Sequence, residues 1–425
     1  MPVPQLIDRL TRAAGRIGRG AAIGSAWQLA RASIQLLWVI LVARLLGPGE
    51  YGLFAGLVGL AATIGTMTGL GLGLVLLLDV PRDPAGFSAA WARSLFVYIA
   101  SGVLLIGVFV MLAPGLTGHD ASLFVLAAIG LSDILCLPLA ALCSYSFQAH
   151  ERMGWAQSMY VVAPAASLCA VLVYSHSGSE PALATYVAYH ASAALVATFI
   201  LLGIVRRTLR PTATRPQYSS AVLQRGMELS LTRGAEFALT NLDRTLVLRL
   251  GGPDLAATYS VATRLATTLA LPAVALCSSA IPMLSRVSDR SPDMHRALVR
   301  KLLLAAVGVG TLAALAMPIL GQLLVWALGV DFQASSQFAT RLALLPLLLG
   351  LTSLGCTVLL ASGRHRLRLA IQSAGLTFLF IPGMYLISNF DAAGAAAMVI
   401  GAQVLTAAGL WFAIRSTASG ISARH

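Results

Sequence analysis

Charged residues are scarce in this sequence. Only 11% of its 425 residues are charged and 58% are hydrophobic, whereas soluble domains carry about 25% charged residues. A chain of this length cannot hide so much apolar surface in a water-soluble fold, so we expect the lipid bilayer to solvate most of it. Lysine is nearly absent as well, because Lys301 is the only lysine among the 29 basic residues.

Motifs for metal binding, disulfides and nucleotide binding are also lacking. The cysteines occur singly in apolar runs, without a CxxC pair or neighbouring histidines at zinc-ligand spacing. No GxxxxGK[ST] phosphate loop occurs, and Gly69 to Gly73 (GLGLG) lies inside an apolar span, where we interpret it as close helix packing. No predicted loop is long enough for a separate catalytic domain. We therefore expect no enzyme activity, no cofactor and no metal. The five cysteines are Cys136, Cys143, Cys169, Cys277 and Cys356.

Long apolar segments dominate the rest. A span needs about 20 mainly apolar residues, and this template predicts an all-α membrane protein of twelve transmembrane helices. Alternate loops contain all but seven of the basic residues, including Arg364, Arg366 and Arg368. This positive-inside pattern predicts that both termini are cytoplasmic. Because it accounts for the net charge of +13, we expect no nucleic-acid partner.

An internal repeat divides the chain. LVARLLGP at 41–48 and LVLRLGGP at 246–253 match at six of eight positions. We interpret this as two six-helix lobes in parallel orientation with a transport site between them; chance similarity of leucine-rich helix ends is the alternative. The predicted parts are a basic amphipathic segment (1–20), a first lobe (21–210), a cytoplasmic linker (211–225), a second lobe (226–415) and a tail (416–425).

Four arginines lie several residues inside predicted spans: Arg31, Arg233, Arg244 and Arg264. An arginine at the bilayer centre costs about 2.5–3.5 kcal/mol on insertion scales. These side chains are therefore expected to face a protein interior or a wet cavity, where they would bind substrate. The remaining three basic residues outside the cytoplasmic loops, Arg44, Arg249 and Arg341, lie at outer helix ends and are expected to be interface anchors.

A polar stripe follows the seventh predicted span, with residues spaced 3, 4, 3 and 4 apart. One interpretation is a cavity wall, and the other is a buried salt-bridge network that holds the lobes in register. Asp133 and His190 are the other ionisable groups within spans, either as ion-coupling groups or as structural hydrogen-bonding groups. With them, Glu236 and Asp243 are candidates for ion coupling. The stripe consists of Arg233, Glu236, Thr240, Asp243 and Val247.

Several segments resemble the polysaccharide-biosynthesis flippases of the Wzx type, in the multidrug/oligosaccharidyl-lipid/polysaccharide exporter superfamily. They are ARLLGPGEYGLFA at 43–55, NLDRTLVLRLGGPDLAATYSVATRLATTLALPAVALCSSAIPMLSR at 241–286, LGVDFQASSQFATRLALL at 328–345 and LLASGRHRLR at 359–368. The second span, with TGLGLGLVLLLD at 68–79, departs from the family pattern because it lacks the usual polar-to-basic ending. Twelve spans also disfavour the related peptidoglycan-precursor flippases, which usually have fourteen.

The resemblance implies a flippase of the bacterial inner membrane. Its cargo would be an oligosaccharide repeat unit on undecaprenyl pyrophosphate, delivered to the periplasmic leaflet for O-antigen or exopolysaccharide synthesis. Membrane lipids, a polysaccharide polymerase and glycosyltransferases are the implied partners. The four buried arginines outnumber Asp133, Glu236 and Asp243, which favours an anionic cargo docked at Arg31, Arg233 and Arg264. The alternatives are a cation-coupled drug antiporter and, from another class, a membrane glycosyltransferase, polymerase or ligase.

Overall fold

The computed structural model describes residues 3–178, 182–212, 219–280 and 292–422, together with Thr214 and Leu284. Every regular element in these ranges is helical, as the sequence predicts, although the side chains of the N-terminal arginine segment lie outside the described part. The elements are α1 (Val3–Gly65), η1 (Thr68–Gly71), α2 (Leu72–Asp79), η2 (Pro84–Gly86), α3 (Phe87–Thr117), α4 (Leu123–Gly130), η3 (Leu131–Cys136), α5 (Leu137–Ala149), α6 (Met153–His176), α7 (Leu183–Leu209), α8 (Ser220–Ser279), α10 (Pro292–Leu328), η4 (Val330–Phe332), α11 (Ala334–Arg341), α12 (Leu345–Ala361) and α13 (His365–Ser422).

Three of these helices contain a sharp backbone break. Helix α1 would be about 95 Å long if it were straight, three times the hydrocarbon thickness of a bilayer. It breaks at Gly47 (φ 73°, ψ 171°), and α8 breaks at Gly252 with nearly the same dihedral angles (φ 79°, ψ 175°). Both glycines precede a proline, and they occupy the same position in the two copies of the sequence repeat. The third break is at Asp391 in α13.

The breaks relate the observed helices to the predicted spans. Eight described helices are long and apolar enough to cross a membrane, or nine if the bent pair 330–341 and 345–361 is one span. Counting the two legs of α1, α8 and α13 separately, and the bent pair as one span, gives twelve candidate segments in the described chain. The count of twelve membrane crossings stays a prediction.

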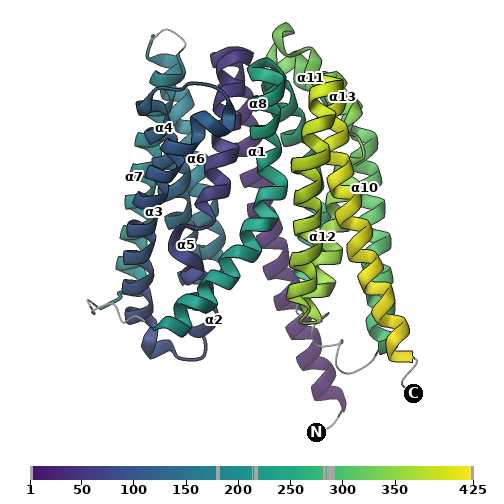
Figure 1. Cartoon of the computed structure of the whole chain (residues 1–425). Coiled ribbons are helices and arrows are strands. Elements are labelled where there is room, and N and C mark those ends of the chain that lie inside the picture. The colour runs from purple at the N-terminus through teal and green to yellow at the C-terminus, as the bar shows by residue number, and fades with distance from the viewer. Residues whose placement is uncertain are drawn as a thin grey trace.

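Two helical bundles stand side by side in Figure 1, with α3 to α7 in one and α10 to α13 in the other. Helices α1 and α8 lie between them. Both ends of the chain lie at the same end of the molecule, which we call the terminal end; the opposite one is the far end. Since α8 already begins at Ser220, the predicted linker at 211–225 is shorter than its sequence suggested.

The second leg of α1 packs closely and antiparallel against the first leg of α8. A Cβ atom on Gly52 would overlap the backbone of Pro253, one on Gly56 would overlap Leu248, and one on Gly59 would press on the backbone of Asn241. Small residues permit such close helix contacts within membranes. This packing, together with the edge-to-face contact of Tyr51 with Phe332 (6.3 Å between centroids), closes the far end.

The predicted second span is not one continuous helix, and that part of the prediction is wrong. The chain leaves the α-helix after Gly65, and three consecutive residues, Gly69, Leu70 and Gly71, have positive φ before α2 begins. Close packing does hold at this position. Gly69 lies against the ring of Tyr98, and Gly71 lies against the backbone of Gly226 in α8.

Hydrogen bonds satisfy backbone groups around the break. The amide of Gly69 donates to Ser101 Oγ (2.8 Å), and Thr68 Oγ1 donates to the carbonyl of Ile134 (2.7 Å). Ile134 belongs to η3, a π-helical turn between α4 and α5. Two irregular segments therefore support each other deep in the first bundle, and both contribute to the cavity described below.

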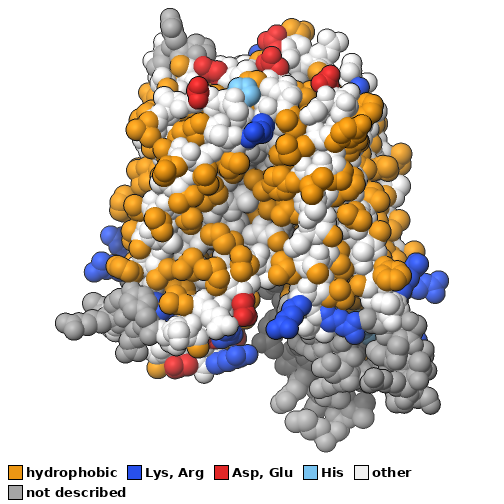
Figure 2. Space-filling model, in the orientation of Figure 1, with side chains coloured by type: hydrophobic (Ala, Val, Ile, Leu, Met, Phe, Trp, Pro, Cys, Tyr) orange, Lys and Arg blue, Asp and Glu red, His pale blue; other side chains and the backbone are white. Residues whose placement is uncertain are grey.

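The surface fits a membrane environment. Figure 2 shows a hydrophobic band around the middle of the molecule, basic side chains gathered toward the terminal end and acidic ones mostly at the far end. Large apolar side chains such as Met111, Trp326 and Phe412 are strongly exposed. Burying them in water-free hydrocarbon is favourable. The chain is a multi-pass membrane protein.

Candidate functional site

Two adjoining chambers lie between the first bundle and α8. The central chamber has a volume of about 230 Å³ and includes Arg244 and Arg264 in its wall. The terminal chamber has a volume of about 380 Å³ and includes Arg233. Arg31 and Asp133 belong to both walls, so the chambers adjoin there. Both walls are built from α1, the first bundle with its neighbouring segment at 66–79, and α8, which is less symmetric than the sequence repeat suggested.

The face of α8 that lines the chambers differs from the predicted stripe. Besides Ser230, the lining residues of its first leg are Arg233, Phe237, Asn241 and Arg244. Their spacing of 4, 4 and 3 also marks one helical face. Glu236 and Asp243 are absent from both walls and have partners elsewhere. The interpretation of the stripe as a single cavity wall is therefore wrong for these two carboxylates.

Asp243 is satisfied inside the protein. Its side chain is only 2% exposed, Tyr259 donates its hydroxyl to Oδ2 (2.6 Å), and the backbone amide of Arg244 donates to Oδ1 (2.9 Å). A buried carboxylate with such donors is stabilised by its own structure. Asp243 therefore fixes the second leg of α8 against the first leg.

Glu236 pairs with the second bundle. Arg368 Nη2 donates to Glu236 Oε2 at 2.5 Å. The sequence placed Arg368 in a cytoplasmic loop, and this was wrong: α13 begins at His365, so Arg368 lies in its first turn and is only 9% exposed. This ion pair offsets the negative charge of Glu236. The cavity is therefore more cationic than the numbers of arginines and carboxylates in the predicted spans implied.

The four predicted arginines have no such partners. Among the described residues, no carboxylate lies within ion-pair distance of Arg31, Arg233, Arg244 or Arg264. The guanidinium of Arg31 lies 5.8 Å from the ring centroid of Tyr160. The guanidinium of Arg264 is close enough to those of Arg244 and Arg31 for electrostatic repulsion between them. Three of these side chains thus form a cluster at the central chamber, which the sequence could not group.

Arg233 occupies the terminal chamber instead. Its charge interacts with the phenols of Tyr145, Tyr160 and Tyr98, which come from α5, α6 and α3, and at longer range with the carboxylate of Glu236. Arg31 and Arg233 are both exposed although each lies well inside its helix, whereas Arg244 and Arg264 are half-buried. Water therefore reaches the arginines from the terminal end, and Figure 2 shows the surface notched between the bundles at that end.

The depth of each arginine follows from the helical rise. Measured along the helices from the far-end turns at Gly47 and Gly252, Arg244 lies about 12 Å, Arg264 about 18 Å, Arg31 about 24 Å and Arg233 about 29 Å down. A bilayer core is about 30 Å thick. The arginines therefore form a ladder from mid-membrane to the terminal-side boundary.

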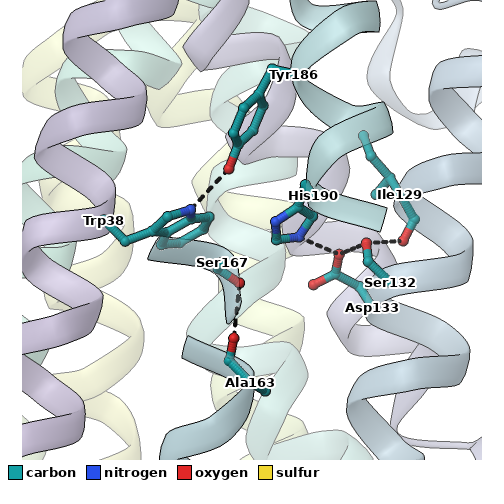
Figure 3. Close-up of polar contacts among 8 residues, drawn as sticks. All are labelled: Trp38, Ile129, Ser132, Asp133, Ala163, Ser167, Tyr186 and His190. Atoms are coloured by element: carbon teal, nitrogen blue, oxygen red, sulfur yellow. Dashed lines mark hydrogen bonds and ion pairs between the residues drawn. The ribbon is translucent and has the colours of Figure 1, made fainter. Parts of the chain in front are cut away.

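Asp133 and His190 lie together in the first bundle, as Figure 3 shows. Ser132 Oγ donates to Asp133 Oδ2 (2.7 Å), and His190 Nε2 lies 4.0 Å from the same oxygen. Trp38 stacks on His190 and donates its indole N–H to Tyr186 Oη (2.8 Å). A carboxylate beside an imidazole at a chamber wall can exchange a proton. The π-helical turn, a feature frequent at functional sites, presents Asp133 there.

The outer arginines differ from one another. Arg249 donates to the carbonyls of Gly115 and Leu116 at the end of α3, where helical carbonyls have no intrahelical partner. Arg341 lies 6.0 Å from the ring centroid of Phe338, and Arg44 is exposed. Arg249 is therefore a tie between α8 and the first bundle rather than a simple interface anchor. Its position in the sequence carries no signal for this partner.

The fold is shared with solved membrane transporters. The chain is similar over 95% of its length, with a TM-score of 0.74 and 13% identity, to an inward-facing multidrug resistance MATE family transporter of the MOP superfamily, of which it covers 99%. For lipid II flippase MurJ in an inward closed conformation, the TM-score is 0.71 at 11% identity, covering 93% of this chain and 87% of that one. For a MOP superfamily transporter from Pyrococcus furiosus with a binding pocket of reversed polarity, it is 0.65 at 12% identity, covering 96% and 97%. The chain has the fold of MOP superfamily transporters.

Its family follows from the sequence. The profile of the polysaccharide biosynthesis protein family matches residues 17–288, and the chain belongs to this family. No protein of curated function matches the sequence significantly. The resemblance to polysaccharide-biosynthesis flippases is thereby confirmed at the level of family and fold.

Proposed function

We propose that this protein flips a lipid-linked oligosaccharide, carried on undecaprenyl pyrophosphate, across the bacterial inner membrane for surface polysaccharide synthesis. The observation that carries the proposal is the ladder of four arginines without carboxylate partners in chambers open at one end. Family membership and the MOP fold support it. The protein moves its cargo without altering it chemically, and a polysaccharide polymerase on the far side consumes the product.

The mechanism is alternating access. The positive-inside pattern places the terminal end, with both chain ends, in the cytoplasm. The far end is packed shut by α1 against α8, so this conformation receives cargo from the cytoplasmic leaflet. Rocking of the bundles would then close the terminal end and open the far end.

Each part of the cargo meets a suitable environment. The guanidinium fork of arginine pairs bidentately with phosphate oxygens, and Arg31, Arg233, Arg244 and Arg264 offer such forks without competing carboxylates. The sugars occupy the wet chambers. The prenyl chain stays in lipid, where each buried methylene contributes about 0.8 kcal/mol.

Complementation tests the proposal. Arg31→Ala and Arg264→Ala should each abolish surface polymer in a strain that lacks its own copy of the gene. Arg341→Ala is the matched control, since this arginine lies at the surface near the far end and lines neither chamber. Immunoblots of membranes establish equal protein levels. Normal polymer with both cavity variants at normal levels would contradict the proposal.

Ion coupling is a second part of the proposal. Asp133 and His190 are the coupling candidates, because Glu236 and Asp243 are engaged with Arg368 and Tyr259. Transport into vesicles should rise under an imposed proton or sodium gradient, and Asp133→Asn should remove this response. A response that persists in Asp133→Asn would exclude Asp133 as the coupling group.

A cation-coupled drug antiporter is the second candidate, favoured by the similarity to a multidrug transporter fold. Such a transporter needs free carboxylates toward its cationic cargo. Asp133 is the only carboxylate in the walls of the two chambers. A drug-sensitivity panel separates the candidates, since the flippase predicts no change when the gene is deleted.

A further inference from the structure

The arginines of the cavity form two groups that one pyrophosphate cannot bridge. Arg233 and Arg244 lie on the same face of α8, about 16 Å apart along the helix axis. Arg244 belongs with Arg264 and Arg31 at the central chamber. Arg233 stands in the terminal chamber, where only Arg31 is a second arginine. The substrate therefore meets two separate cationic stations.

The terminal station lies where the lipid's phosphates would be. Arg233 is about 29 Å below the far-end turn, which is close to the full thickness of a bilayer core. A lipid that still rests in the cytoplasmic leaflet carries its pyrophosphate at this depth. Arg233 and Arg31 therefore suit the pyrophosphate, and its sugars extend from there into the central chamber.

At the central station Arg244 and Arg264 have no carboxylate within ion-pair distance among the described residues, although Asp133 belongs to the same chamber wall. The Nε of Arg244 is buried without a hydrogen-bond partner, and so is the hydroxyl of Ser260, which is only 1% exposed and belongs to the same wall. Arg264 adds a like charge nearby. Unsatisfied buried polar groups and unpaired buried charges are costly. An anion bound between Arg244, Arg264 and Ser260 would relieve all three.

The surroundings of this station suit sugars. Gln35 and Asn241 provide amide groups in the chamber wall, and Trp38 provides an aromatic ring. Amides pair with hydroxyls, and a mostly apolar pocket with a few convergent polar groups orients a small ligand. The station therefore combines hydroxyl recognition with a demand for negative charge.

We propose that the central chamber binds an acidic sugar, through a carboxylate that the oligosaccharide carries in addition to the lipid pyrophosphate. The inference rests on the proposed flippase function and narrows its cargo to anionic repeat units. Arg244 and Arg264 bind the sugar carboxylate, and Ser260 donates a hydrogen bond to it. Arg233 binds the pyrophosphate.

Binding to three matched probes tests the inference, with the full chain in nanodiscs. The probes are a short-chain prenyl pyrophosphate, the same lipid carrying galactose, and the same lipid carrying galacturonic acid. A hydrogen-bonded charge pair contributes about 1.5–3 kcal/mol, so the wild type should prefer the acidic over the neutral sugar probe by about tenfold or more.

Variants separate the two stations. Arg264→Gln and Arg244→Gln should remove the preference for the acidic sugar and weaken binding of the prenyl pyrophosphate much less than Arg233→Gln does. Arg233→Gln should weaken all three probes by the same factor. Ser260→Ala removes only the hydroxyl group and should reduce the preference in part. Thermal unfolding of each variant excludes misfolding.

Three outcomes overturn the inference. Equal affinity of the wild type for the galactose and galacturonic acid probes would show that the central chamber has no site for an acidic sugar. Loss of prenyl pyrophosphate binding in Arg264→Gln, as large as in Arg233→Gln, makes the central station a phosphate site and leaves the flippase function intact. If no probe binds, the proposed function fails together with the inference.

Discussion

The ionisable side chains inside the membrane-spanning part differ in whether they have an ion-pair or hydrogen-bond partner. Asp243 has two internal donors and Glu236 has Arg368, whereas Arg31, Arg233, Arg244 and Arg264 have no carboxylate within ion-pair distance in the described chain. A satisfied buried charge holds structure together, and an unsatisfied one needs a ligand or water. The arginines are therefore the side chains through which substitutions should change cargo handling.

Asp243 should behave as a structural residue. Asp243→Ala leaves the hydroxyl of Tyr259 and the amide of Arg244 without their acceptor, which should lower the free energy of unfolding by about 1–3 kcal/mol. Asp243→Asn keeps an acceptor oxygen and should lose less. Thermal unfolding of the purified variants measures the difference. Asp243→Asn that folds normally but no longer responds to an ion gradient would show a coupling role instead.

The ion pair of Glu236 and Arg368 should tolerate reversal. Glu236→Ala leaves Arg368 buried without its counter-charge and should lower thermal stability, as should Arg368→Ala by freeing Glu236. The exchange Glu236→Arg with Arg368→Glu restores an ion pair with reversed polarity. The exchanged variant should be more stable than either of its component single variants, Glu236→Arg or Arg368→Glu. If its loss of stability equals the sum of the losses of these two variants, the two side chains do not interact.

Sequence reasoning found the buried arginines because hydrocarbon penalises any arginine without a polar surrounding. It left open whether Glu236 and Asp243 line the cavity or pair inside the protein, and it misplaced Arg368. Helical periodicity shows which residues share a face, but it does not show which face meets a neighbouring helix. Arg368 was misplaced because helix starts are poorly marked where a basic loop runs directly into a helix, as at 364–368.

At the scale of elements, glycines set how closely helices approach. The second leg of α1 depends on Gly52, Gly56 and Gly59 for its contact with α8. The break around Gly69 and Gly71 was missed because apolar glycine-rich sequence is compatible both with close packing and with a broken helix. Only the neighbours, Tyr98 and Gly226, make the broken form necessary.

The closure of the far end should be sensitive to a single methyl group. Gly52→Ala places a Cβ in the backbone of Pro253, and overpacking of this kind costs about 1–3 kcal/mol. Gly107→Ala is the matched control, because no atom lies within 4 Å of a Cβ there. The melting temperature should fall for Gly52→Ala alone. Equal melting temperatures for both variants would show that α1 and α8 are not tightly packed.

At the scale of the whole molecule, Arg249 ties α8 to the end of α3 in the first bundle at the far end. Arg249→Gln should loosen this closure and shift molecules toward opening at the far end. Arg341→Gln is the control, since its charge contacts only the ring of Phe338.

Cysteine labelling measures the shift. A cysteine at position 51, now 4% exposed, should react faster with a membrane-impermeant maleimide in whole cells when Arg249→Gln is present. Cys169, the one exposed native cysteine in the described chain, is replaced beforehand. An unchanged labelling rate would mean that Arg249 does not help to hold the far end closed.

The first leg of α8 belongs to the second half of the sequence but packs against the first half. Arg225 pairs with Asp79 at 2.8 Å, Ser230 donates to the carbonyl of Thr66, and Gly226 touches Gly71. A helix encoded in the second half thus completes the first. If the gene is divided between codons 212 and 219, each polypeptide expressed alone should be degraded, while co-expression should yield a co-purifying pair. The expected outcome is that neither half of the chain, each carrying one copy of the sequence repeat, folds as a unit by itself.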